Sequence, residues 1–370
     1  MRLWKIGLVG LGAALFLGPP VQADQFEHAL PGRVFSFPRD HFSHPEFRTE
    51  WWYYTGHLYP RDGRSYGYQL TFFRSALRRE TLEKSRWAAS TLYFGHFALT
   101  DENKKVFRFR ERISRGALGQ AGARTDRLEV WIDDWRVTME GSDHVLVARD
   151  PSMAIRLRLT PSKGPIIHGI DGVSQKAEGE GYASHYYSMT RMRTQGELTV
   201  DGEVLTADGL SWMDHEFMSN QLRDTQVGWD WFSIQLDHNT ELMLYVIRHQ
   251  DGRPDPYSSG TLIYPDGSSR HLRLKEFEIH VLGTWKSKAT ATSYPARWRI
   301  HAPHSDIDLM LNPTVPDQEL TTQESTQITY WEGSVTVNGT YGGKPVVGVG
   351  YVELTGYAQP FEDMATRIAE

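Results

Sequence analysis

The sequence predicts an all-β protein made of two related antiparallel β-barrels in tandem. Three observations lead to this fold class. Runs rich in β-branched and aromatic residues recur along the chain, short turn signals separate them, and four motifs of the first half return in the same order in the second half. Residues of this kind fit the pleated surface of a sheet, and many strands with close turns are typical of barrels and sandwiches.

Most of the chain beyond its N-terminal segment has the pattern of strands. In Val106–Ser114, the stretch FRFRER alternates apolar and basic residues, as a half-buried strand does. Turn signals such as PRDG at Pro60–Gly63 and YPDG at Tyr264–Gly267 end the runs. Helical periodicity is scarce, and Ser75–Ala89 is the best candidate for a short helix, or else a loop. The clearest predicted strands of the first half are Tyr66–Arg74, Ser90–Thr100, Val106–Ser114, Leu128–Met139 and Ala154–Thr160.

The two halves of the chain repeat the same motifs. GELTVDG resembles GSVTVNG, and GLSWMD at Gly209–Asp214 aligns with GVGYVE at Gly348–Glu353. Upstream, TEWWYYTGHL and YQLTFFR have counterparts in VGWDWFSIQL and LMLYVIR. Chance similarity of short hairpins is the alternative, but four echoes in one order favour a duplicated unit. We therefore expect one barrel over residues 24–220 and a second over residues 221–370.

The N-terminus has the three parts of a secretory signal peptide. Arg2 and Lys5 form a positive region, Ile6–Leu17 is apolar, and VQA, which ends at Ala23, is a small-residue cleavage site. The apolar run is too short to span a bilayer comfortably, and a retained N-terminal anchor is the alternative. We expect a signal peptide over residues 1–23 and a periplasmic or secreted protein.

The composition excludes several classes of function. Charged residues make up 23% of the chain and the formal net charge is -6, which argues against a nucleic-acid-binding surface. The absence of cysteine excludes a thiol nucleophile and a disulfide framework. No G-x-S-x-G elbow, H-E-x-x-H motif or phosphate-binding glycine loop is present. We expect no cofactor and no metal, although His57, His96, His185 and His215 could form a metal site if they converge in a barrel.

The stretch GLSWMDHEFMSN carries the strongest candidate for chemistry. Alternate side chains of a strand face opposite sides, so Trp212, Asp214 and Glu216 share one face and His215 lies on the other. If the first face lines a barrel interior, two carboxyls lie roughly 6.5–7 Å apart beside an indole, and burial raises the pKa of at least one. Such a carboxyl stays protonated near neutral pH and can act as a general acid. The alternatives are a strand end whose acidic residues meet solvent, or one at which His215 turns towards the carboxylates.

Two further clusters lie upstream of this stretch. In SHYYSMTRMR, His185 and Tyr187 share a strand face, although a lone histidine on a strand is more often a core or surface residue than a catalyst. In TEWWYYTGHLY, Glu50, Trp52 and Tyr54 share a face. Several arginines are available as partners of Glu50, so a structural ion pair at a barrel rim explains this residue at least as well as catalysis.

Taken together, TEWWYYTGHL, YYSMTRM, SWMDHEF and WDWFSIQLD resemble the AttH-like family, which is related to carotenoid 1,2-hydratase (hydroxyneurosporene synthase). The resemblance covers nearly all of the chain after residue 23. It implies two lipocalin-like β-barrels, in agreement with the internal repeat. Many members are exported bacterial proteins, and the carotenoid hydratases add water to a terminal isoprenoid double bond.

The resemblance also implies roles for single residues. In the hydratase branch, an aspartate in an aromatic-x-Asp strand is the proposed acid, and a His-x-aromatic pair upstream supports it. By this resemblance, Asp214, which follows Trp212, aligns with this aspartate, and His185 and Tyr187 align with the pair. MDHEF follows the AttH-like branch and departs from the hydratase branch, which argues against a carotenoid as the substrate.

The leading hypothesis is a cofactor-independent enzyme that hydrates a hydrophobic substrate, such as an isoprenoid, in a barrel cavity, or performs related lyase or isomerase chemistry. Asp214 would protonate the double bond, and His185, or His215 with Glu216, would position and deprotonate the attacking water. The expected substrate-binding residues are Trp212, Tyr187, Trp52, Tyr54 and Glu50. Two alternatives stay open: a non-catalytic periplasmic carrier of a lipid or isoprenoid, and an accessory protein that docks on an envelope transporter.

Overall fold

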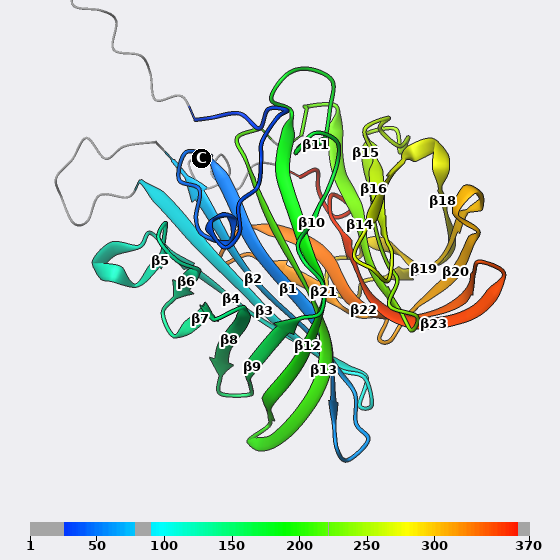
Figure 1. Cartoon of the computed structure of the whole chain (residues 1–370). Coiled ribbons are helices and arrows are strands. Elements are labelled where there is room, and N and C mark those ends of the chain that lie inside the picture. The colour runs from blue at the N-terminus through cyan, green and yellow to red at the C-terminus, as the bar shows by residue number, and fades with distance from the viewer. Residues whose placement is uncertain (1–25, 78–89, 221, 362–370) are drawn as a thin grey trace, which may run out of the picture.

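The computed structural model describes residues 26–77, 90–220 and 222–361, which form two antiparallel sheets (Figure 1). Within these ranges the helices are short 3₁₀ turns, and none is long and apolar enough to cross a membrane. The predicted signal peptide and residues 78–89 of the helix candidate lie outside the described residues.

The first sheet has the strand order β4-β3-β2-β1-β13-β12-β9-β8-β7-β6-β5, and β10 and β11 pair with β12. This sheet curls so that its two ends approach each other. Arg112 of β4 donates a hydrogen bond to the carbonyl of Ile132 in β6 at 3.1 Å. The strands are β1 Thr49–Pro60, β2 Tyr66–Ala76, β3 Thr91–Asp101, β4 Val106–Ser114, β5 Ala121–Ala123, β6 Glu129–Ile132, β7 Trp135–Glu140, β8 Asp143–Asp150, β9 Met153–Pro161, β10 Ile166–Ile167, β11 Ser174–Gln175, β12 Ala183–Val200 and β13 Glu203–Met218.

The second sheet has the order β17-β16-β15-β14-β23-β22-β20-β19-β18, and β21 pairs with β22. Its strands are β14 Gln226–Leu236, β15 Glu241–His249, β16 Ser259–Ile263, β17 Ser269–Arg273, β18 Glu278–Lys286, β19 Ser293–Ala302, β20 Ile307–Pro313, β21 Glu319–Thr322, β22 Ile328–Tyr341 and β23 Lys344–Leu354.

Both sheets are built on the same plan, which explains the repeated motifs. In each sheet the first strand pairs with the last, β1 with β13 and β14 with β23. Tyr53 lies opposite Asp214, and Trp231 lies opposite Glu353, so the aligned motifs occupy equivalent places. The all-β class and the tandem arrangement are confirmed. The expected boundary at residue 220 lies in the segment that joins β13 to β14.

Each sheet wraps around its own apolar core, and a third cluster lies between the sheets. In this third cluster, Trp212 of β13 packs edge-on against Trp231 of β14, with ring centroids 6.3 Å apart. Figure 1 shows β12 and β13 in the middle of the molecule, with the second sheet beside them. The end of β13 is therefore buried on both faces, one against the first core and one against the second sheet.

Candidate functional site

A cavity opens between the two sheets, and the empty space in it, together with the open solvent at its mouth, amounts to about 1030 Å³. Its walls are mainly apolar, as is typical of small-molecule sites, and they carry a few ionisable groups. The aromatic side chains of the wall include Trp51, Tyr53, Tyr186, Trp229, Trp231 and Tyr245. The charged residues of the wall are Asp214, Glu216, Glu353 and Lys176.

Asp214 is the most deeply buried carboxyl of this cavity wall, with 4% of its surface exposed. It accepts hydrogen bonds from Trp212 Nε1 at 2.6 Å, from the Tyr186 hydroxyl at 2.8 Å and from the Ser188 hydroxyl. Burial raises the pKa of Asp214 to about 7, although the three donors act in the opposite direction. Among the described residues no cation forms an ion pair with Asp214, so a substantial fraction of this carboxyl is protonated near neutral pH.

A buried chain of polar groups leads away from Asp214. The Ser188 hydroxyl lies 2.6 Å from His168 Nε2, and His168 Nδ1 lies 2.8 Å from the Thr261 hydroxyl. Burial lowers the pKa of His168 well below its usual range, so the ring is neutral. Since Ser188 donates to Asp214, His168 Nε2 carries the hydrogen that Ser188 accepts, and Thr261 donates to Nδ1. This order of donors holds the Ser188 hydroxyl towards Asp214.

Glu216 shares the face of Asp214 but has a different environment. Lys176 Nζ lies 3.1 Å from its carboxylate, and the Ser184 hydroxyl donates a hydrogen bond to it. Lys176 also lies over the ring of Tyr245, 4.0 Å from the centroid. Burial alone would lower the pKa of Lys176, but the charge of Glu216 outweighs it and raises this pKa. Glu216 is therefore a paired carboxylate, in contrast to Asp214.

The second sheet adds two carboxyls at this interface. Glu353 is half-buried on the cavity wall and accepts a hydrogen bond from Trp229 Nε1 at 2.9 Å. Burial raises the pKa of Glu353 to about 7, and the acidic residues of β13 raise it further. Glu332 lies opposite Glu353 on β22, is 1% exposed and accepts a hydrogen bond from Tyr53 at 2.6 Å. Burial and the charge of Glu353 hold the pKa of Glu332 well above its usual range, so Glu332 is neutral.

The first sheet divides the residues predicted from the sequence into two sets. Trp212, Asp214 and Glu216 face the second sheet. We had expected these three residues to face the interior of a barrel. The physical reason is that the second sheet covers the outer face of β13, and the period of a strand does not say which face is covered. The other six residues lie on the opposite face of the sheet, on the side of the first barrel: Glu50, Trp52, Tyr54, His185, Tyr187 and His215.

This division corrects the expected mechanism. Trp52 stacks on His215 with ring centroids 4.8 Å apart, and neither side chain reaches Asp214. His185 contacts the carbonyl of Gly172 at 2.8 Å, at one end of the first barrel. His185 and His215 therefore lie on the wrong side of the sheet to deprotonate a water beside Asp214.

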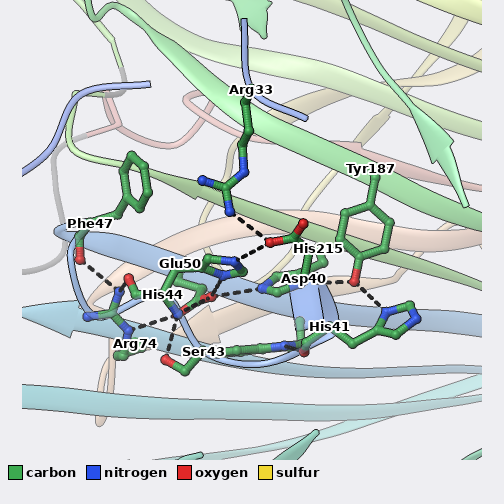
Figure 2. A network of polar contacts seen from close by, with 11 residues as sticks. Arg33, Asp40, His41, Ser43, His44, Phe47, Glu50, Arg74, Tyr187 and His215 are labelled. Atoms are coloured by element: carbon green, nitrogen blue, oxygen red, sulfur yellow. Dashed lines mark hydrogen bonds and ion pairs between the residues drawn. The ribbon is translucent and has the colours of Figure 1, made fainter. Parts of the chain in front are cut away.

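Glu50 lies at the centre of a buried polar network, which Figure 2 shows. Arg74 Nε donates to one carboxylate oxygen at 3.0 Å, while His44 Nδ1 and His215 Nε2 each lie 2.9 Å from the other. Burial alone would raise the pKa of Glu50, but Arg74 and the two histidines outweigh it and hold this pKa well below its usual range. The structure thus places Glu50 in the ion pair that the sequence offered as the alternative to catalysis.

His44, Glu50 and His215 are the one group of the described residues whose ligand atoms lie close enough together for a metal ion. Their atoms already have partners, since His44 Nε2 lies 3.0 Å from Asp40 and the guanidinium of Arg74 lies against Glu50. A cation here would displace these bonds beside a fixed positive charge, so the donor set fits an ion-pair network better than a metal centre. Four histidines were considered as a metal site if they converged: His57, His96, His185 and His215. They do not converge, because each contacts a different partner.

Several residues of the cavity wall were not among those predicted from the sequence. Ser188 lies opposite Asp214 in the pairing of β12 with β13, so knowledge of this register would have pointed to Ser188 and, two residues before it, Tyr186. Trp231 occupies the position in the second half of the repeat that Tyr53 occupies in the first, so the repeat could have pointed to Trp231 as a site residue. Lys176 comes from the connection between β11 and β12 and has no sequence signal.

Comparison with known proteins gives relatives over most of the chain. A family model described as AttH-like matches residues 28–357. A crystal structure of an AttH candidate from Nitrosomonas europaea has a TM-score of 0.82 and 32% identity, and the match covers 90% of this chain and 100% of that one. Kievitone hydratase of Fusarium solani subsp. phaseoli is 23% identical over 273 residues, which is 71% of this chain and 75% of that protein. The structure of kievitone hydratase from Nectria haematococca shares the fold, with a TM-score of 0.71 and 16% identity over 91% of this chain and 97% of that one.

Proposed function

The chain belongs to the AttH-like family, and we propose that it is a hydratase-like enzyme, which adds water to a carbon–carbon double bond in the cavity between its two sheets. The observation that carries the proposal is Asp214, a carboxyl that is buried on the cavity wall without a cationic partner among the described residues. A carboxyl that stays protonated near neutral pH is the group that such a reaction needs. Similarity to kievitone hydratase supports the same class of reaction.

The chemistry begins with the proton of Asp214. This proton passes to one carbon of the double bond, whose π electrons form the new C–H bond and leave a cation on the other carbon. The oxygen of a water molecule bonds to this cation, and the water then loses a proton to a base. Trp212, Tyr186 and Ser188 donate to the carboxylate that forms, so they stabilise the negative charge where it develops.

The cavity wall suits an apolar alkene and its cation. Aromatic faces attract a desolvated cation by up to about 2 kcal/mol each. Tyr186 contacts Asp214, Trp231 contacts Tyr186, and all three line the same cavity. A trisubstituted double bond of the isoprenoid type gives a tertiary cation, which needs the least stabilisation. We therefore propose a hydrophobic small molecule with such a double bond as the substrate, and a reaction that uses no cofactor.

Turnover in water enriched in ¹⁸O tests the proposal. The probes are kievitone, taken from the relative, and geraniol and farnesol, two isoprenoid alcohols with trisubstituted double bonds. Wild-type protein should convert at least one probe into a product heavier by one labelled water, and Asp214→Asn should not. Binding of a probe without any conversion by wild-type protein would overturn the proposal and favour a carrier.

The two alternatives fit the site less well. A carrier has no need of a buried carboxyl without a cation, whereas Asp214 is such a group and Glu216 beside it is paired. An accessory protein that docks on a transporter needs an exposed aromatic patch. Among the described residues the exposed large apolar side chains are aliphatic, apart from Tyr59.

We also propose that the protein is exported and that residues 1–23 are removed, on the basis of the positive, apolar and small-residue parts of that segment. N-terminal sequencing of protein recovered from the periplasm or medium should begin at Asp24. A chain that keeps its first residues and stays with the membrane would contradict this part of the proposal.

A further inference from the structure

We propose that Glu353 of the second sheet is a second catalytic carboxyl, which accepts the proton of the attacking water while Asp214 protonates the double bond. The inference rests on the proposed hydration and deepens it, because it names the base of the same site. Each of the two sheets then contributes one carboxyl to the reaction.

The two carboxyls occupy equivalent places in the repeat. Asp214 lies opposite Tyr53 in the pairing of β1 with β13, and Glu353 lies opposite Trp231 in the pairing of β14 with β23. Each accepts a hydrogen bond from an indole, Asp214 from Trp212 and Glu353 from Trp229. Both side chains line the same cavity from different sheets, so a bound alkene can contact one carboxyl from each wall.

The contacts of Glu353 suit a base. Trp229 donates to its Oε2, while its Oε1 accepts no hydrogen bond from the described residues and is free for a water in the cavity. The other acidic residues of this interface are less available. Glu216 is held by Lys176 and a serine hydroxyl, and Glu332 is buried behind the wall, where it accepts a hydrogen bond from Tyr53.

The protonation states required of the pair follow from burial and mutual repulsion. Like charges on one cavity resist ionising together, and the charge of Asp214 raises the pKa of Glu353, so ionisation of one carboxyl favours the protonated form of the other. Glu353 is half-buried and Asp214 is almost fully buried, so the anion is better solvated on Glu353. The neutral state of Glu332, opposite Glu353 on β22, adds no further repulsion.

The reaction step balances with these two groups. Asp214 loses its proton to carbon and becomes a carboxylate, water forms the C–O bond, and Glu353 accepts the water proton. The product is the alcohol, and the negative charge has moved from Glu353 to Asp214. Water that enters the open cavity then returns the proton from Glu353 to Asp214 before the next turnover.

Glu353→Gln and its matched control Glu332→Gln test the assignment on the alkene of the panel that wild-type protein hydrates. The glutamine at 353 can still accept from Trp229, and the glutamine at 332 can still accept from Tyr53, so both variants should fold. We expect Glu353→Gln to lower kcat about 10²-fold or more and to lose the acidic limb of the pH profile, where the base becomes protonated. Glu332→Gln should keep the wild-type rate and both limbs.

Other titratable groups on the wall should not produce that limb. Glu216 and Lys176 pair with each other, and burial lowers the pKa of His96 to about 3, so its ring is neutral. Wild-type kcat with an intact acidic limb in Glu353→Gln would overturn the role of Glu353 and leave the hydration itself standing. No conversion of any probe by wild-type protein would instead overturn the proposed function and this inference with it.

Rescue with a small carboxylate separates a catalytic role from a packing role. In Glu353→Ala, formate can enter the space left on the cavity wall and replace the missing base. Formate should raise the rate of Glu353→Ala at least about tenfold and should leave the rate of Asp214→Asn unchanged. A folded Glu353→Ala protein that formate does not accelerate would contradict the assignment.

Discussion

Asp214 and His215 are neighbours in β13, but their side chains lie on opposite faces of the first sheet. Asp214 faces the cavity between the sheets, while His215 faces the first barrel and contacts Glu50 at 2.9 Å. The strand thus separates a buried carboxyl that lacks a cation from a network of paired charges. Substitutions on its two faces should therefore change different properties, activity on one side and stability on the other.

Asp214→Asn should abolish most of the activity and keep the fold. An asparagine carbonyl can accept from Trp212 and Ser188, and its amide can donate to the oxygen of Tyr186, so the local bonds survive. Loss of the transferable proton should lower kcat by about 10²-fold or more. Steady-state kinetics, together with thermal unfolding of the same samples, measures both effects. Full activity of a folded Asp214→Asn protein would exclude Asp214 as the acid.

Arg74→Met should destabilise the protein without affecting the chemistry. It leaves the carboxylate of Glu50 buried without its guanidinium, which typically costs about 3–5 kcal/mol in the free energy of unfolding. The double variant Arg74→Met/Glu50→Gln should recover part of this loss, because it removes the unpaired charge. Urea unfolding measures the stability, and kcat per folded molecule should stay at the wild-type value, since Arg74 does not line the cavity. A large loss of kcat with unchanged stability would place the Glu50 network in the active site.

The free energy of unfolding should fall as the pH rises through the titration of Asp214. Its pKa is raised from 3.8 to about 7 in the folded protein, so between these values the folded state binds more protons than the unfolded chain. Stability from this group is therefore present at low pH and is lost as the pH rises towards 7. In Asp214→Asn the free energy of unfolding should depend less steeply on pH. The variant should therefore gain stability relative to wild type as the pH rises. Urea titrations at several pH values measure the slope, and parallel curves would contradict the raised pKa.

Ser188→Ala should raise the pKa of Asp214 further and move the alkaline limb of the pH profile upward. The reason is that the Ser188 hydroxyl stabilises the carboxylate, and its removal favours the protonated form. Ser184→Ala is the matched control, because Ser184 lies on the same face of β12 but donates to Glu216. The pH dependence of kcat should thus shift in the first variant and stay in place in the second. Equal shifts in both would remove the specific link between Ser188 and Asp214.

Gly67→Ala should loosen the contact between the two sheets. A Cβ atom there would lie 2.6 Å from the hydroxyl of Tyr351 and 2.8 Å from Cβ of Ser334, both in the second sheet. Such overpacking typically costs about 1–3 kcal/mol, and activity should fall because the cavity is formed by both sheets. Gly164→Ala is the control, since nothing lies within 4 Å of its added Cβ. Thermal unfolding and kcat measure the result, and wild-type behaviour of Gly67→Ala would show that the sheets do not need this close contact.

The sequence was sufficient for the class of fold, because local patterns carry it. Alternation and β-branched residues indicated the strands, and the repeated motifs indicated two units, in each of which the first strand pairs with the last. Alternation also placed Asp214 and Glu216 on one face and His215 on the other. These features depend on neighbours along the chain, which a single sequence contains.

The location of the site depended on contacts that no local pattern contains. Both faces of the second half of β13 are buried and each carries apolar as well as ionisable side chains, so the period of two could not tell which face meets the first core and which meets the second sheet. His185 and Tyr187 were grouped with Asp214 by resemblance, whereas the register of the hairpin sets Ser188 opposite it. Lys176 reaches the cavity from a connection between strands, where position follows from the tertiary fold alone.

The state of Asp214 can be measured without any substrate, by ¹³C NMR titration of wild-type protein with labelled aspartate carboxyls, beside Asp214→Asn. We expect one carboxyl resonance in the wild-type protein that titrates near pH 7 and is missing from the variant. Titration of this resonance near the ordinary value of 3.8 would show an ionised carboxylate at neutral pH, and Asp214 could not then be the acid of a hydratase.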